Sequence, residues 1–84
     1  MIPIQDLLHR IRWDPNFGRG EFTIGYYDRV AHELRLVPLR ALHFEPGDHY
    51  AFQLIDDEGV EHTIPLHRIK AVFKDGALIW HREH

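Results

Sequence analysis

The hydrophobic positions of this chain follow helical spacing near the N-terminus and alternate along most of the remaining sequence. Ile4, Leu7, Leu8 and Ile11 recur at i, i+3, i+4 and i+7, the apolar stripe of an amphipathic helix. Pro3 stands where a first helical turn accepts proline. A helix of about eight residues is too short to be stable alone. We therefore expect its apolar stripe to pack against a sheet.

The segment 12–20 breaks the helical spacing and predicts a loop. An Asp-Pro step disfavours helix at Asp14, and two glycines favour a turn before the next element. The loop would carry Arg12 and Trp13. In one interpretation Trp13 and Phe17 close the end of the core, with the charges solvated. In the other, Arg12 faces a ligand.

A half-buried strand is predicted within residues 20–30. Its even positions (Phe22, Ile24, Tyr26) form one face and its odd positions (Glu21, Thr23, Tyr27) the other. If the extended geometry persists, Arg29 follows Tyr27 on the outer face. A flat ring beside a guanidinium suits the base and phosphate of a nucleotide. The alternative is an ordinary solvated strand end with a cation stacked on a ring.

Shorter apolar segments, separated by turn residues, predict further strands in hairpin order. The strand at 34–37 would be antiparallel to the first strand and end at Pro38. A run from 48 would have Tyr50, Phe52 and Leu54 on one face, and 60–64 would follow it after a turn at 56–59. The last two strands, 71–73 and 77–80, would flank an Asp-Gly turn. Pro65 predicts a kink that re-aims His67 and Arg68.

These elements predict an α+β fold. A short N-terminal helix would pack on a curled, mainly antiparallel sheet of five or six strands, with barrel-like closure left open. The 84 residues are expected to form a single domain, 1–84.

Composition narrows the possible partners. A net charge of -3 argues against an indiscriminate nucleic-acid binder, yet eight of the ten cations are arginine, which grips phosphate with two hydrogen bonds. Without cysteine, thiol catalysis and thiolate metal sites are excluded. No apolar run is long enough to span a membrane and no secretory signal is present. A cytoplasmic protein is expected, with no membrane partner.

Common catalytic motifs are absent. The eight histidines lack the i, i+4 spacing of zinc proteases, and no phosphate-binding glycine loop or nucleophile elbow occurs. We therefore expect neither metal nor cofactor. A phosphodiesterase using His62 and His67 as acid and base remains an alternative, although no histidine has Ser or Thr two positions later. Equally, His67 can be a histidine hydrogen-bonded inside the sheet.

Four segments carry a resemblance to a known family. They are Ile11-Arg12-Trp13-Asp14, Gly25-Tyr26-Tyr27-Asp28-Arg29, Ile64-Pro65-Leu66-His67-Arg68-Ile69, and Trp80 with Arg82. The chain resembles the RNA cyclic-group end recognition domain, formerly a domain of unknown function, over nearly its whole length. The resemblance implies a module that binds RNA 3' ends bearing a 2',3'-cyclic phosphate or a related group, in RNA processing or repair.

The residues and the resemblance together predict a site. Its phosphate ligands would be Arg12, Arg29, His67 and Arg68; Trp13 and Tyr27 would stack a base; and Asp28, otherwise a plain turn residue, would orient an arginine. A separate RNA-processing enzyme would act on the bound end. A protein-interaction adaptor is a further alternative, and the oligomeric state is left open. The prediction requires Arg29 and Arg68 to meet in the fold.

Overall fold

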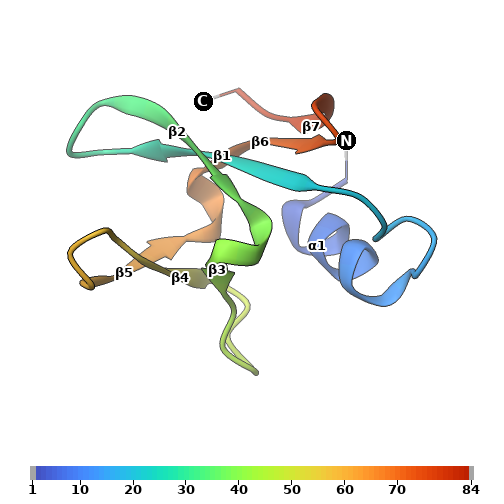
Figure 1. The fold of residues 1–84 in the computed structure, drawn as a ribbon, viewed down its shortest axis with the longest axis horizontal. Coiled ribbons are helices and arrows are strands. Elements are labelled where there is room, and N and C mark those ends of the chain that lie inside the picture. Colours follow the sequence, from blue (N-terminus) through green and yellow to red (C-terminus); the bar gives the residue numbers. More distant parts are fainter. Residues whose placement is uncertain (1, 84) are drawn as a thin grey trace.

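The computed structural model describes residues 2–83 as one helix, seven strands and two short 3-10 turns (Figure 1). The elements are α1 (Ile4–Trp13), β1 (Phe22–Asp28), β2 (Glu33–Pro38), η1 (Leu39–Ala41), β3 (Leu42–His43), β4 (Ala51–Ile55), β5 (Glu61–Pro65), η2 (Leu66–Arg68), β6 (Ile69–Lys74) and β7 (Ala77–His81). The predicted α+β fold is confirmed. None of the described residues form a helix long and apolar enough to cross a membrane.

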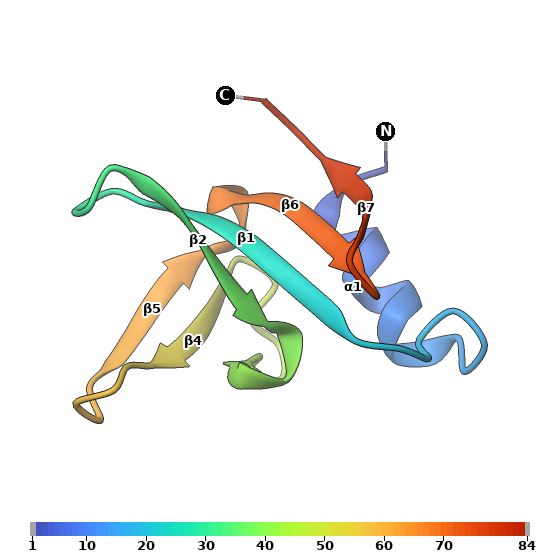
Figure 2. The same cartoon turned by 45° about the horizontal axis from the view of Figure 1, so that its top comes forward.

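The strands form two antiparallel sheets. Sheet A has the order β2-β1-β6-β7, and sheet B has the order β3-β4-β5. Sheet B and α1 lie on the same side of sheet A (Figure 1), and β4 and β5 run in a different direction from β1 and β6 (Figure 2). The sequence suggested five or six strands in one curled sheet; seven are present in two sheets, and these do not close into a barrel.

The core lies between sheet A and the layer made by sheet B and α1. Its fully buried side chains are Ile24, Phe52, Ile69 and Val72. The helix contributes Ile4 and Leu7, as its apolar stripe predicts. Further members are Phe22, Tyr26, Leu42, Ile64, Leu66 and Trp80. Alternate positions of β1 therefore point inward, and the opposite face of sheet A is left uncovered.

α1 continues two residues further than the sequence suggested. The helix ends at Trp13, so Arg12 and Trp13 lie in its last turn and not in a loop. Asp14 then takes extended geometry, and its Oδ1 accepts hydrogen bonds from the backbone N–H of Asn16 (3.0 Å) and Phe17 (3.1 Å). The Asp-Pro step thus stops the helix after Trp13, because Asp14 is the first residue it excludes from helical geometry.

The glycine after this turn allows the chain to fold back on the helix. A Cβ on Gly18 would lie 2.3 Å from the carbonyl oxygen of Ile11, closer than real contacts allow. Phe17 is thereby packed against the core, whereas Trp13 remains 64% exposed. Of the two aromatic residues proposed to close the core, only Phe17 does so.

Two strand boundaries also bear on the predictions. The alternation predicts Tyr50 in a strand, on one face with Phe52 and Leu54, but β4 begins at Ala51 and Tyr50 is 82% exposed. Asp48 Oδ1 accepts the backbone N–H of Tyr50 at 2.9 Å, which forms a turn before the strand. By contrast, the Asp-Gly hairpin is confirmed: Asp75 and Gly76 have φ of 50° and 84°, the geometry of a tight antiparallel turn.

Candidate functional site

The first predicted phosphate ligand, Arg29, lies in the turn after β1. The strand ends at Asp28, whose Oδ1 accepts hydrogen bonds from the backbone N–H of Val30 (2.9 Å) and Ala31 (3.2 Å). An aspartate that bonds its own downstream backbone favours a turn over an extended chain. The expectation that Arg29 continues the outer strand face after Tyr27 is therefore wrong. Arg29 is exposed at the tip of the β1–β2 hairpin.

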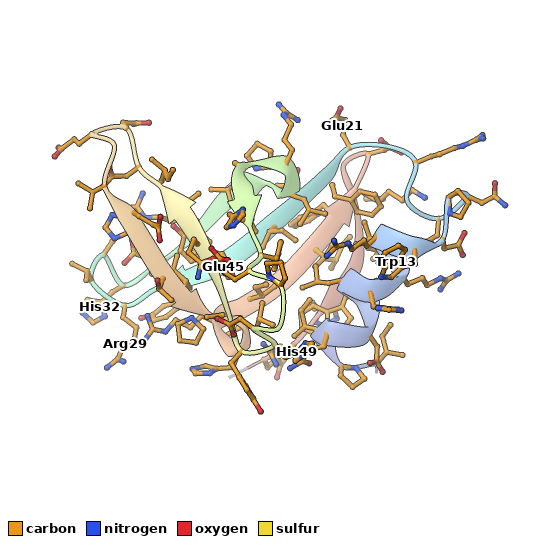
Figure 3. The ribbon with its side chains drawn as sticks, turned by 90° about the horizontal axis from the view of Figure 1, so that it is seen from below. Trp13, Glu21, Arg29, His32, Glu45 and His49 are labelled. Atoms are coloured by element: carbon orange, nitrogen blue, oxygen red, sulfur yellow. The ribbon has the colours of Figure 1, made fainter. Side chains whose placement is uncertain are left out.

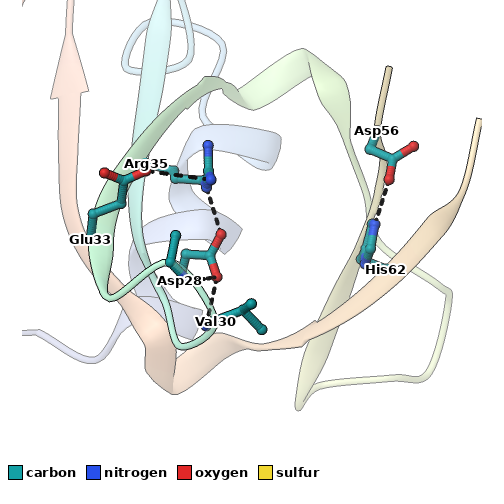
Figure 4. Close-up of polar contacts among 7 residues, drawn as sticks. Asp28, Val30, Glu33, Arg35, Asp56 and His62 are labelled. Atoms are coloured by element: carbon teal, nitrogen blue, oxygen red, sulfur yellow. Dashed lines mark hydrogen bonds and ion pairs between the residues drawn. The ribbon is translucent and has the colours of Figure 1, made fainter. Parts of the chain in front are cut away.

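Asp28 orients an arginine, but not one of the predicted phosphate ligands. Its Oδ2 accepts a hydrogen bond from Arg35 Nε at 2.5 Å, and Arg35 also lies 3.4 Å from Glu33 (Figure 4). The Arg35 hydrogen bond, followed by the backbone N–H of Ala31, lowers the pKa of Asp28 below its ordinary value of 3.8. Arg35 is thus shared between two carboxylates, and its charge is offset within the hairpin.

The predicted kink at Pro65 is the turn η2, which contains His67 and Arg68. Two contacts from distant parts of the chain hold it. Leu66 N–H donates to the Tyr50 carbonyl at 2.8 Å. From the C-terminal segment, Arg82 donates from Nε to the Ile69 carbonyl and from Nη2 to the Leu66 carbonyl, each at 2.8 Å. The backbone of η2 is therefore fixed at both ends.

The register of sheet A brings the end of β1 beside η2. Tyr26 pairs with Ile69 in the antiparallel β1–β6 ladder, with a bulge just before Tyr26. Residues that come after Tyr26 therefore run alongside those that precede Ile69. The segment 27–29 and the segment 66–68 consequently lie at the same end of the sheet, although about 40 residues separate them in sequence.

Within residues 2–83, the side chains at this end of the sheet leave cationic groups unpaired. Neither Arg29 nor Arg68 forms an ion pair or a side-chain hydrogen bond, and the His67 ring forms none either. Arg29 and His67 are exposed, and Arg68 is half-buried. The arginines of this region other than Arg35 are therefore available to an anion.

A comparison with known protein families identifies the chain. The family described as the MJ1316 RNA cyclic group end recognition domain matches residues 1–82, nearly the whole sequence. The chain belongs to this family. No curated protein and no solved structure matches it. The resemblance carried by the four sequence segments is thereby confirmed, and the family's name concerns the recognition of RNA cyclic group ends.

Two tyrosines flank η2 in this RNA cyclic group end recognition domain. Tyr27 is half-buried on β1, and a hydrogen bond of 3.3 Å joins its hydroxyl to His32 Nδ1. Tyr50, which is not among the predicted site residues, is the more exposed of the two and is tied through its carbonyl to Leu66. The turn signal at Asp48 could have indicated its exposure.

The other two predicted site residues, Arg12 and Trp13, lie elsewhere in the domain. Figure 3 shows Arg29 at one end of the molecule and Trp13 towards the other, with His49 between them. The seven-residue β1 strand, which leads from the loop after the helix to the β1–β2 turn, is itself about 20 Å long at roughly 3.3 Å per residue. The predicted site is therefore divided into two parts.

The histidine pair considered for hydrolysis is also divided. His62 lies near the start of β5 and His67 lies in η2, just beyond the end of the same strand. His62 Nε2 is 2.7 Å from Asp56 Oδ2 (Figure 4), a contact that lowers the pKa of Asp56. In the described part of the chain no cluster of His, Asp and Glu could hold a metal ion.

Proposed function

We propose that this domain binds single-stranded RNA 3' ends that carry a 2',3'-cyclic phosphate or a related group, with Arg29, His67 and Arg68 at the phosphate. One observation carries the proposal. The β1–β6 ladder ends at Tyr26 and Ile69, so the end of β1 that leads to Arg29 and the turn η2 belong to the same end of sheet A, and the side chains of Arg29, His67 and Arg68 have no partner within the described residues. Tyr50 and Tyr27 supply rings for the terminal base.

The chemistry of the end group fits such a site. A cyclic phosphate carries one negative charge on two non-bridging oxygens, which one guanidinium binds through two parallel hydrogen bonds while a second donor bonds their remaining lone pairs. His67 can donate a further hydrogen bond. A site that grips one phosphate does not need a long basic track, which agrees with the net charge of -3.

The proposed role is binding and not hydrolysis. His62 lies near the start of β5, where its ring contacts Asp56, and His67 lies in η2, beyond the end of that strand. An acid and a base that act on one phosphate must both be within hydrogen-bond reach of it. We propose that the domain holds the end for a separate RNA-processing or repair enzyme in the cytoplasm.

The direct test compares three short RNAs of identical sequence that end in a 2',3'-cyclic phosphate, a 3'-phosphate or a 3'-hydroxyl. Fluorescence anisotropy with a 5'-labelled RNA gives the three affinities. We expect the cyclic end to bind most tightly and the hydroxyl end least. Equal affinity for the cyclic and hydroxyl ends would refute end recognition. The RNA recovered after incubation should still carry its cyclic phosphate, and an opened ring would refute the non-catalytic role.

The residue assignment is tested with Arg68→Ala. Loss of a direct hydrogen bond to a charged group should weaken binding of the cyclic end by about 1.5 to 3 kcal/mol. Arg19→Ala is the control, since Arg19, like Arg68, has no ion pair among the described residues, but it is exposed and lies in the loop before β1. Circular dichroism of both variants checks the fold. If the two substitutions have the same effect, Arg68 is not a specific ligand.

A further inference from the structure

A groove runs along α1 on the side that faces the 42–49 segment. Its volume is about 540 Å³, within the range of small-molecule sites. One wall comes from the helix (Leu8, His9, Arg12 and Trp13), and the other comes from Phe44, Pro46 and His49. Leu39 and Leu42 also line it. The groove is thus apolar inside, with aromatic and cationic side chains on its walls.

Trp13 is the exposed aromatic ring of this groove. Its 64% exposure means that the fold gains little from it, because an indole that served the core would be buried as Trp80 is, at 6%. The His9 ring lies 6.1 Å from the indole, and the Arg12 guanidinium lies 5.2 Å from it. An exposed ring with a cation beside it is the arrangement on which single-stranded nucleic acids stack their bases.

The acidic residues of the groove favour a base over a phosphate as its occupant. Asp48 and Glu45 both line the groove. Asp48 Oδ1 is engaged by the backbone N–H groups of Tyr50 and Ala51, and Glu45 Oε1 lies 3.1 Å from His43 Nε2. Their remaining oxygens can accept hydrogen bonds from the amino groups of a base, but they would repel a buried phosphate. Arg12 at the end of the helix can hold the phosphate outside.

The groove begins where the proposed end site lies. Leu66, the first residue of η2, lines the groove together with His49, and Leu66 is bonded to Tyr50. From Gln5 to Trp13 the helix wall extends about 12 Å, at 1.5 Å per residue. A strand whose last phosphate is bound at η2 therefore has a continuous path along α1 for the nucleotides that precede it.

We infer that this groove is a second nucleotide subsite, in which the base of a nucleotide on the 5' side of the RNA end stacks on Trp13. The inference rests on the proposed function, because η2 fixes the strand's end. It assigns Arg12 and Trp13 to the upstream nucleotide and separates them from recognition of the terminal group. It also explains why these residues lie far from Arg29 in a domain that binds one ligand.

The test measures affinity as a function of RNA length. The ligands are adenosine 2',3'-cyclic phosphate and the di- and trinucleotides of adenosine with the same cyclic end, titrated calorimetrically. For the wild-type chain we expect the longest ligand to bind about tenfold more tightly than the mononucleotide, the value of one stacked base. Trp13→Ala should abolish this gain and leave mononucleotide binding unchanged, whereas Trp13→Phe should retain part of it.

Controls separate the groove from the end site. Leu36→Ala removes another exposed side chain, 59% exposed on the opposite face of sheet A, and should keep the full length dependence. Arg68→Ala should weaken all three ligands equally. Quenching of Trp13 fluorescence by the hydroxyl-ended trinucleotide reports the groove independently of the cyclic group. If affinity does not rise with RNA length and Trp13 fluorescence is not quenched, the subsite is overturned, even if the cyclic end is bound. If Trp13 is quenched but cyclic and hydroxyl ends bind equally, only the proposed function is overturned.

Discussion

The role of Asp28 depends on the strand that pairs with it and not on its neighbour in the sequence. Asp28 and Arg29 are neighbours in sequence, yet the carboxylate binds Arg35 on the next strand. The β1–β2 register pairs Asp28 with Glu33 and Tyr26 with Arg35, so Asp28 and Arg35 are diagonal neighbours on one face of the sheet. The sequence indicated correctly that Asp28 binds an arginine. It could not indicate which one, because that depends on a register shared by two strands.

The Asp28–Arg35 contact predicts how stability depends on pH. The pKa of Asp28 is lowered in the folded chain, so ionised Asp28 stabilises the fold above its ordinary value of 3.8, and this stabilisation is lost as pH falls through the lower, folded value. Asp28→Asn keeps an oxygen for the turn but loses the charge. Urea denaturation should find the variant less stable than wild type at pH 7, with a smaller difference at pH 3. A difference that grows on acidification would contradict the assignment.

Among the elements, the helix and the hairpins could be predicted from spacing, and their ends could not. The stripe of Ile4 and Leu7 indicated α1 correctly, but its last turn includes Arg12 and Trp13, where polar and exposed residues give no apolar periodicity. The kink at Pro65 was also predicted, since proline interrupts a strand ladder wherever the chain is folded. The contacts that hold this kink could not be predicted, because they come from Arg82 in the C-terminal segment after β7.

Arg82 positions the backbone of η2, so its substitution should change both the stability of the fold and RNA binding. Arg82→Ala leaves the carbonyls of Leu66 and Ile69 without their donors, which should cost the fold about 1 to 3 kcal/mol. It should also weaken binding of the cyclic end, although less than Arg68→Ala does. Hydrogen exchange provides a readout that loss of a phosphate contact would not change: the Leu66 amide should exchange faster in the free variant. Unchanged exchange together with weaker binding would instead make Arg82 a direct ligand.

At the scale of the whole molecule, the strand order creates the proposed site. β1 lies between β2 and β6 in sheet A, and this arrangement brings the end of β1, which leads into the Arg29 turn, to the end of sheet A where η2 lies. Sequence patterns indicated every strand except the two-residue β3, but not the β1–β6 pairing, because alternation specifies which face is buried and leaves the choice of neighbouring strand open. Hairpin order alone suggested one curled sheet. The short, separate strands β3 to β5 instead fold across it as a second layer.

The distribution of charge over the whole domain predicts a weak dependence of RNA binding on salt. With a net charge of -3 and three of the eight arginines paired with carboxylates, attraction must come from a few local contacts. Each phosphate neutralised on single-stranded RNA contributes a slope of about -0.7 to log K against log salt, so the end phosphate held by Arg29 and Arg68 and one upstream phosphate held by Arg12 together give about -1.4. Anisotropy titrations of a short cyclic-ended RNA between about 50 and 200 mM salt measure this slope. Arg12→Ala, which removes the contact to the upstream phosphate, should reduce its magnitude by about 0.7, and Trp13→Ala should leave it unchanged because stacking releases no counterions. A slope of about -5 or steeper would require a long basic track, which is incompatible with a reader of RNA ends on this acidic surface.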